Sequence, residues 1–569
     1  MANKMADSTL NLYFGPASVY TCLGGMAETV AGLEAGRSGL AYQDKFGMWA
    51  GLFDVPVLDG YTRFESAVIG QIQQVLDRTE VKLSDPMTRL VLSTTKGNVD
   101  LLAETCRKTM DVVPERAFLY DAAKAVARYF GSARNPIVIS NACISGVTAF
   151  VVAQDLVASG EAEHVLVVGC DVLSEFITTG FASFKSISAG PCRPYDSRRD
   201  GLTLGEACGC VLLTTDSNLA DSAGIRLASG AVTNDANHIS GPSRTGEGLY
   251  YAMRNAMQKA GISAGRIGFV NAHGTATRYN DEMESKAMAW AELDTTPLNS
   301  LKGYIGHTLG ASGVVETILC LEQLKRGYIW GTRGLETSDT PCALQVSADR
   351  QVISQPYCIK TASGFGGCNA AIVLEKIGKQ EGRKHAASFP VHDARVQFEA
   401  KLVADYRLPA SHRPFADYVR TLFKNLGESN MKFYKMSDMS KGLYVAVAYL
   451  LTKVDWTDTA PVRRAIVLAN HSASLDTDLL HQSELERHLP EGCSPAVFVY
   501  TLPNVSAGEM CIRHKIQGNN TFFVEDEDSG LVEHYANRLI ATDCADAVIC
   551  GWCDYLQGKW DIHVKLLKK

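Results

Sequence analysis

One cysteine lies where a predicted strand passes into a predicted helix. The β-branched residues 137–139 predict a short buried strand, and apolar residues recur at helical spacing over 147–157. Cys143 lies between the two, near the helix N-terminus, where free N–H groups and the helix dipole favour a thiolate. Such a position can lower a cysteine pKa from about 8.5 to roughly 3.5–7.5. We therefore interpret Cys143 as a candidate nucleophile, the alternative being an inert buried cysteine.

Two histidines follow this cysteine in the chain, each in a loop rich in glycine or threonine. His273 comes shortly after the mostly apolar residues 267–270, and His307 lies in the glycine-rich stretch 303–313. A single loop histidine is usually a surface or hydrogen-bonding residue. Two of them at strand ends, downstream of a cysteine, indicate nucleophilic catalysis. A third glycine-rich loop, residues 363–369, precedes another apolar strand.

The elements that must position these loops alternate along the chain. Short apolar runs alternate with helical stretches over 1–215 and again over 216–377, which predicts α/β sheets with helical crossovers. Between them, Asp196, Arg199 and Glu206 lie in a polar, glycine-rich segment. We interpret these three as structural ion pairs and not as catalytic groups.

Length and composition limit the possible functions. A chain of 569 residues predicts several domains, and a net charge of -7 argues against nucleic acid as a main partner. No apolar run approaches the roughly 20 residues of a membrane helix, and the first residues do not have the pattern of a signal peptide. The 16 cysteines are scattered in apolar surroundings, which favours reduced thiols and a cytoplasmic location.

Together the motifs resemble the elongating β-ketoacyl-acyl-carrier-protein synthases of the thiolase superfamily. The resemblance covers roughly residues 10–377 and rests on five motifs in order: Asn141-Ala-Cys143, His273-Gly-Thr275, Lys302, Gly306-His307 and Gly364-Phe365-Gly-Gly. It implies an α/β, thiolase-like fold of two βαβαβαββ halves in an α-β-α-β-α arrangement. The first half, 1–215, holds the cysteine, and the second, 216–377, holds the histidine pair. Such enzymes usually pair as dimers.

The resemblance also implies a reaction. Cys143 takes the acyl chain from a thioester, and the N–H groups of Cys143 and Phe365 form an oxyanion hole. His273 and His307 donate hydrogen bonds to the malonyl thioester carbonyl and stabilise the enolate formed by decarboxylation. The expected partner is an acyl carrier protein, whose phosphopantetheine is part of the substrate. No metal and no resident cofactor are expected.

Other residues of these motifs have supporting roles by the same resemblance. Lys302 pairs with Glu316 and orders the histidines. Phe365 gates the acyl pocket, between Gly364 and Gly366. Thr275 and Thr277 contact the pantetheine arm or support their loop. The family often has an aromatic residue where Ser363 stands.

The remaining chain is an internal repeat. Residues 378–395 are charged and predict a linker, and 396–569 resemble a degenerate second copy of a ketosynthase N-terminal half. Glu527 stands at the nucleophile position of this copy. We expect this α/β half-domain to pack, to shape the acyl tunnel or to dock a partner. A catalytic role for Glu527 is the alternative.

Two functional hypotheses follow. The first is a decarboxylative condensing enzyme of fatty acid or polyketide elongation, with an aryl polyene-type chain suggested by the unusual tail. The alternative is a non-catalytic, chain-length-type scaffold in a ketosynthase heterodimer. A scaffold predicts a missing nucleophile or histidine, whereas this chain keeps Cys143, His273, His307 and Lys302. Homodimer and heterodimer both remain open.

Overall fold

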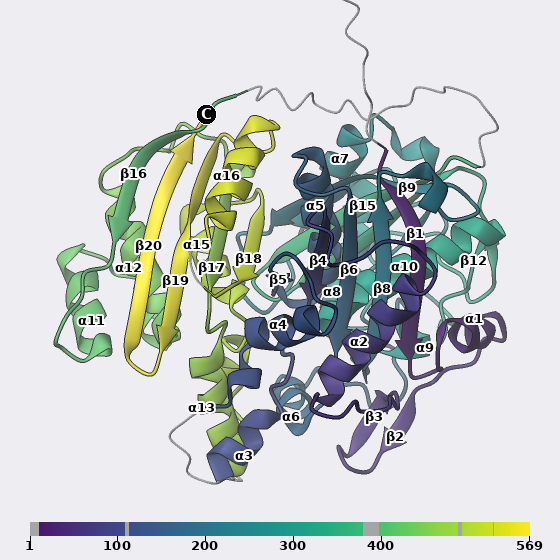
Figure 1. Cartoon of the computed structure of the whole chain (residues 1–569), viewed down its shortest axis with the longest axis horizontal. Helices are drawn as coiled ribbons and strands as arrows, with labels where there is room; N and C mark the ends of the chain where they lie inside the picture. The colour runs from purple at the N-terminus through teal and green to yellow at the C-terminus, as the bar shows by residue number, and fades with distance from the viewer. Residues whose placement is uncertain (1–10, 108–112, 379–397, 488–491, 527–528) are drawn as a thin grey trace, which may run out of the picture.

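Fifteen strands form one continuous mixed sheet that divides into three parts of five strands (Figure 1). The computed structural model describes residues 11–107, 113–378, 398–487, 492–526 and 529–569. In each part, taken in the strand order given below, the first two pairs of neighbouring strands are antiparallel and the last two pairs are parallel. The expected repetition of the fold is therefore confirmed, and the described structure contains three copies of the five-strand unit.

The first part is formed by the N-terminal half of the chain. Its strands, in sheet order, are β1 (Tyr13–Thr21), β8 (Ala207–Thr214), β6 (His164–Asp171), β4 (Thr88–Ser93) and β5 (Ile137–Ile139). Two helices pack on its outer face, α2 (Arg63–Leu76) and α4 (Leu119–Tyr129). A capping box starts α2, because Thr62 and Glu65 satisfy each other's backbone N–H groups.

The second part follows in the chain and stacks against the first. Its strands are β9 (Ile225–Asn234), β15 (Cys368–Lys376), β14 (Tyr357–Gly364), β10 (Ile267–Asn271) and β11 (Leu298–Asn299). The two parts join through a single residue pair of β1 and β9, Tyr13 with Arg226. Two helices lie between the sheets and share one apolar core, α5 (Ser145–Ala158) and α10 (Ser312–Arg326). The outer face is covered by α7 (Glu247–Lys259) and α8 (Arg278–Trp290), which completes the predicted α-β-α-β-α layers.

The third part is built by the C-terminal region, which we call the tail (residues 398–569). Its strands are β16 (Lys401–Arg407), β20 (Lys559–Lys568), β19 (Ala547–Leu556), β17 (Arg464–Asn470) and β18 (Asn520–Val524). The helices used below are α12 (Asp438–Leu451), α13 (Leu475–Glu486), α14 (Pro495–Val499), α15 (Asn504–His514) and α16 (Leu531–Ala541). The predicted internal repeat is thus present as the same strand order and directions. Glu527 and most of the predicted linker lie outside the described residues.

The tail joins the rest of the sheet at β5, as Figure 1 shows for the green-to-yellow strands. Strand β18 pairs antiparallel with β5, through Phe523 opposite Ile139 and Val524 opposite Val138. The N–H of Ser140 donates to the carbonyl of Phe522 at 3.1 Å. Because β5 and β18 are equivalent strands of two copies, the copies meet edge to edge across an approximate twofold axis. An edge strand that would otherwise be open is therefore covered.

None of the described helices is both long enough and apolar enough to cross a bilayer. None of the 16 cysteines, all of which lie in the described ranges, forms a disulfide.

Candidate active site

Cys143 lies on a tight turn between β5 and α5. The turn is one 3-10 segment, Ala142–Ile144, in which Ala142 has a φ of 50°. A left-handed conformation costs roughly 1–2 kcal/mol in a residue with a Cβ. Ser145 offsets this cost, because its hydroxyl accepts from the Asn141 N–H at 2.8 Å and donates to the Ala142 carbonyl at 2.6 Å. The thiol is thus held at the start of α5, as the sequence predicts.

His307 faces this thiol because α5 and α10 begin side by side. A Cβ added at Gly146 would lie 2.6 Å from the Val314 nitrogen, and one at Gly313 would lie 2.3 Å from the Val147 nitrogen. The two glycines therefore allow backbone contact between the helix starts. As a result, His307 Nε2 lies 3.1 Å from Cys143 Sγ. The other ring nitrogen of His307, Nδ1, lies 3.2 Å from the Ser312 hydroxyl.

His273 completes the constellation from the end of β10. Its ring centroid lies 5.2 Å from that of His307, with the planes at 89°. The backbone N–H groups of His273 and Gly274 donate to the two carboxylate oxygens of Glu284, at 2.8 and 2.7 Å. Glu284 thus fixes the loop from α8. The His273 Nδ1 atom is buried and has no hydrogen-bond partner among the described residues.

A buried charge cluster lies behind the histidines. Lys302 Nζ binds Glu316 Oε1 at 2.7 Å, which confirms the predicted pair, and Lys360 binds the other carboxylate oxygen. Burial alone raises the pKa of Glu316, but the two lysines together hold that pKa below its usual value. The sequence interpretation did not include Lys360. Its signal is a lysine inside the otherwise uncharged strand β14.

Electrostatics at Cys143 differ from the prediction. Burial raises the pKa of the Cys143 thiol to about 12, although the charge of Lys302 opposes the rise. The expected lowering of this pKa is therefore wrong, because loss of water around the thiolate outweighs the favourable charges. Burial, followed by repulsion from Lys302, lowers the pKa of His273 and His307 well below the usual value. The site thus holds a thiol beside neutral imidazoles.

The loop that carries Phe365 lies against the nucleophile turn. A Cβ added at Gly364 would be 3.1 Å from the Cys143 nitrogen, and Gly366 has a φ of +90°. The Phe365 ring contacts those of Phe181 and Phe184, at centroid distances of 6.1 and 5.4 Å. Phe498, from α14 of the tail, contacts the same two rings. The tail therefore contributes to the aromatic wall around Phe365.

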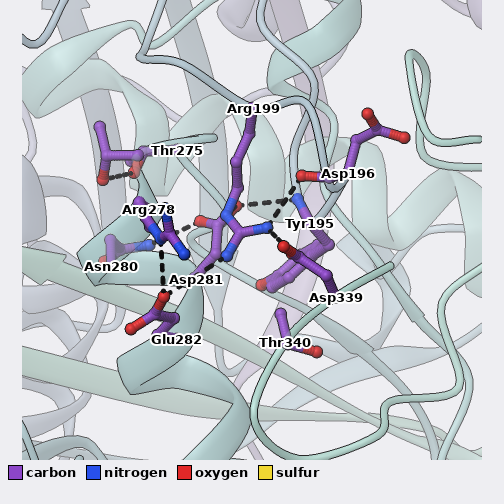
Figure 2. Close-up of polar contacts among 12 residues, drawn as sticks. Tyr195, Asp196, Arg199, Thr275, Arg278, Asn280, Asp281, Glu282, Asp339 and Thr340 are labelled. Carbon is purple, nitrogen blue, oxygen red and sulfur yellow. Dashed lines mark hydrogen bonds and ion pairs between the residues drawn. The ribbon is translucent and has the colours of Figure 1, made fainter. Parts of the chain in front are cut away.

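A polar network supports the loop after His273, as Figure 2 shows. Arg199 donates to the Asp196 carbonyl at 2.8 Å and lies 3.8 Å from the carboxylate of Asp281 at the start of α8. The hydroxyls of Thr275 and Thr277 lie 2.9 Å apart in this loop. The ion pairs predicted for Asp196 and Arg199 are present, since Asp196 lies 3.5 Å from Arg198 and Arg199 lies near Asp281. The ion pair predicted for Glu206 is present as well, with Arg63 at 2.6 Å.

Two further residues near the site were not predicted. Asp171, at the end of β6, accepts from the Gly310 N–H at 2.7 Å and from the Thr95 N–H at 3.0 Å. Burial raises the pKa of Asp171 to about 6, against the effect of these bonds. Asn504 of the tail donates to the Phe365 carbonyl at 2.8 Å. The position of Asn504 beside Phe365 depends on tertiary packing, for which the sequence carries no local signal.

Comparison with known proteins adds independent findings. The N-terminal domain of β-ketoacyl synthase matches residues 79–218, and the C-terminal domain matches residues 225–336. The chain is 34% identical to the 3-oxoacyl-acyl-carrier-protein synthase 2 of Mycobacterium leprae over 41% of its length, and 31% identical to that of Vibrio cholerae over 42%. The matched regions span 59% and 62% of those relatives' own lengths.

Solved structures share the fold. A ketosynthase, ApeO, in complex with its chain length factor, ApeC, from Xenorhabdus doucetiae matches 64% of this chain and 98% of its own, with a TM-score of 0.58 and 25% identity. The PfaC keto synthase-chain length factor matches 98% of this chain and 78% of its own, with a TM-score of 0.79 and 14% identity, so it shows the fold alone. This chain therefore contains the N- and C-terminal domains of β-ketoacyl synthase, in that order and with its cysteine and histidine loops inside them, and carries a further C-terminal region.

Proposed function

We propose that the chain catalyses decarboxylative Claisen condensation of an acyl thioester with malonyl-acyl carrier protein, giving 3-oxoacyl-acyl carrier protein. One observation carries this proposal: Cys143 Sγ lies 3.1 Å from His307 Nε2, with the His273 ring beside it. A nucleophile and a base at this distance are the requirement for covalent acyl transfer. Two imidazoles next to the acyl site supply hydrogen-bond donors for a second carbonyl.

In the first half of the reaction the thiol must lose its proton as it attacks. Because burial raises the Cys143 pKa to about 12, little thiolate exists at neutral pH. His307 is neutral and in contact with the thiol, so its Nε2 accepts the proton and later returns it to the departing carrier thiol. The N–H groups of Cys143 and Phe365 stabilise the tetrahedral oxyanion.

In the second half the malonyl thioester replaces the departed carrier. Between the two halves the neutral His307 exchanges its ring proton with water from Nδ1 to Nε2, and Nδ1 then accepts from the Ser312 hydroxyl. His273 and His307 now donate N–H groups to the thioester carbonyl, so that loss of carbon dioxide leaves an enolate on a stabilised oxygen. The enolate carbon attacks the acyl group on Cys143 and releases the thiolate. The buried Lys302 charge favours both the enolate and this thiolate.

The tail, on this proposal, serves as the second subunit in cis. Equivalent strands β5 and β18 pair in one chain. Lys96 extends from the N-terminal half into the tail and binds Asp478 at 2.7 Å and Ser474 at 3.1 Å. These contacts occupy the edge through which two separate chains would pair. The separate partner is then the acyl carrier protein. We also keep a cytoplasmic location and domain boundaries at 215, 377 and 395 as proposals.

A chain-length-type scaffold is the weaker candidate. Such a scaffold needs no nucleophile, yet here Cys143, His273, His307 and the Lys302–Glu316 pair form one connected site. The scaffold role fits the tail better. Fatty acid and polyketide elongation, including the aryl polyene type, share this chemistry, so the proposal covers both.

The test is product formation. The full chain is incubated with acyl- and malonyl-carrier protein, and the carrier is analysed by mass spectrometry. A 3-oxoacyl-carrier protein formed by wild type and not by Cys143→Ala supports the proposal. Absence of product and of acyl-enzyme in the wild type, with a range of acyl lengths, would favour the scaffold.

A further inference from the structure

The loop that carries Phe365 has one bond of its own to that residue, from the Cys368 thiol to the Phe365 carbonyl at 3.2 Å, and its other bonds come from outside. It connects β14 to β15, and Gly366 and Gly367 have φ values of +90° and +70°. Glycine backbone of this kind is easily rearranged. Its shape is set by bonds from other segments: Gly366 N–H donates to the Ile239 carbonyl at 2.6 Å, and Asn234 donates to the Gly366 carbonyl at 2.8 Å.

The tail supplies a further restraint, at Phe365 itself. Asn504 at the start of α15 is 1% exposed, and its Nδ2 donates to the Phe365 carbonyl at 2.8 Å. Its Oδ1 has no hydrogen-bond partner among the described residues. The helix lies directly on the loop, because a Cβ at Gly508 would be 2.7 Å from the Gly366 carbonyl oxygen. The buried amide is therefore present as a donor to Phe365.

The tail also holds the nucleophile turn. Asn141, two residues before Cys143, accepts from the Phe522 N–H at 2.7 Å and donates to the Asn520 carbonyl at 2.7 Å. Both bonds reach strand β18 of the tail. The turn with the Cys143 amide and the loop with the Phe365 amide are thus each fixed from the same domain.

We propose that the tail sets the oxyanion-binding geometry of the first domain, with Asn504 as a positioning residue. Asn504 holds the Phe365 carbonyl, while Gly364 is held by its pairing with Cys368 in the β14–β15 hairpin. The N–H between these two fixed points keeps one direction, toward the thioester oxygen. The inference rests on the proposed condensation. It assigns the tail a role in the rate of acyl transfer and not in folding alone.

The test separates acyl transfer from thiol reactivity. Asn504→Asp keeps the volume of the side chain and replaces the donor by an acceptor. Single-turnover acylation of Cys143 by an acyl-carrier protein depends on oxyanion stabilisation, whereas alkylation of Cys143 by iodoacetamide does not. We expect acylation to fall by roughly 10- to 100-fold and alkylation to stay within about twofold of wild type, since the thiol's surroundings are unchanged.

Two further variants complete the design. Gly508→Ala moves α15 off the loop and is expected to give the same split between acylation and alkylation. Asn537→Ala, on α16, removes a side chain that bonds only the Glu533 carbonyl of its own helix among the described residues, and is expected to change neither rate. Acylation at the wild-type rate in Asn504→Asp overturns this inference alone. Equal loss of acylation and alkylation in both test variants overturns it as well, because it indicates general disruption. A wild-type chain that is not acylated overturns the proposed function and the inference together.

Discussion

His273 and His307 are 3% and 2% exposed, and the two imidazoles lie next to a thiol whose pKa burial raises to about 12. At the residue scale, the reacting thiol and the two imidazoles are therefore uncharged in the resting site. The charges lie one layer behind, on Lys302, Lys360 and Glu316. Proton transfer between thiol and imidazole therefore has to accompany attack.

The pH dependence of Cys143 alkylation follows from its raised pKa. Between pH 7 and 10 the thiolate fraction rises tenfold for each pH unit, since the pH stays below a pKa of about 12. We expect the iodoacetamide rate at Cys143, measured by peptide mass spectrometry, to rise with this slope and without a plateau. Free glutathione, measured in parallel, levels off near its own thiol pKa. A plateau for Cys143 below pH 8 would mean that the thiol is activated in the resting site.

Glu316 neutralises two buried lysines, so its removal is expected to be costly. Glu316→Gln leaves Lys302 and Lys360 buried without a countercharge, and breaking such pairs costs roughly 3–5 kcal/mol. In the full chain we expect this loss of stability to lower the denaturant midpoint at which the first domain unfolds. The unfolding is measured by tryptophan fluorescence. Glu336→Gln, which removes a partner of Arg198 that is 66% exposed, is the control and should cost less than about 1 kcal/mol. Equal midpoints for both variants would contradict the role of the cluster.

At the scale of elements, the paired starts of α5 and α10 bring the cysteine and histidine loops together. The contact depends on Gly146 and Gly313, whose Cα atoms face the backbone of the opposite helix. Both turns before these helices contain a residue with positive φ, Ala142 at 50° and Leu309 at 53°. The catalytic distance is therefore a property of two packed helices.

Gly146→Ala tests this contact. The added methyl would lie 2.6 Å from the Val314 nitrogen, so the helices must separate. We expect a loss of about 1–3 kcal/mol in stability and at least a tenfold fall in Cys143 acylation. Gly70→Ala, in α2 with open space around the new Cβ, is the matched control and should stabilise by roughly 0.5–1 kcal/mol. Full activity in Gly146→Ala would show that the helix contact does not set the site.

Sequence patterns predicted these elements better than their environment. Buried strands such as β4 and β6 could be predicted from apolar runs, and Cys143, His273 and His307 from their positions at strand ends. The Cys143 pKa could not, because the helix start is visible in the sequence and the surrounding burial is not. Lys360 and Asn504 were missed since only tertiary packing brings them to Glu316 and Phe365. The repeat indicated a third half-domain but not the β5–β18 edge at which it docks.

At the scale of the whole molecule, the tail takes the place of a second subunit on the proposed function. The tail covers β5, binds Lys96 in a buried ion pair with Asp478, and adds Phe498 to the aromatic wall. Burial lowers the pKa of Lys96, and Asp478 opposes this change. A second copy therefore has no open β5 edge to pair with.

The mass in solution tests this arrangement. Light scattering after size-exclusion chromatography is expected to give the mass of one chain, 61.6 kDa. Val524→Pro removes a backbone donor on β18 and should expose β5, giving dimers or aggregates. Val403→Pro, at a bulge on the outer strand β16, is the control and should stay monomeric. A stable wild-type dimer would contradict the proposed role of the tail as an internal partner.

The central claim, that Cys143 takes and passes on an acyl group, is tested most directly by following that residue through one cycle. The full chain is mixed with an acyl-carrier protein, and one portion is then chased with malonyl-carrier protein. Portions taken before and after the chase are digested and analysed by peptide mass spectrometry. We predict an acyl mass on the peptide with Cys143, its loss on the chase, and a 3-oxoacyl-carrier protein in equal amount. An unmodified Cys143 that still reacts with iodoacetamide, or an acyl group that malonyl-carrier protein does not discharge, would contradict the account.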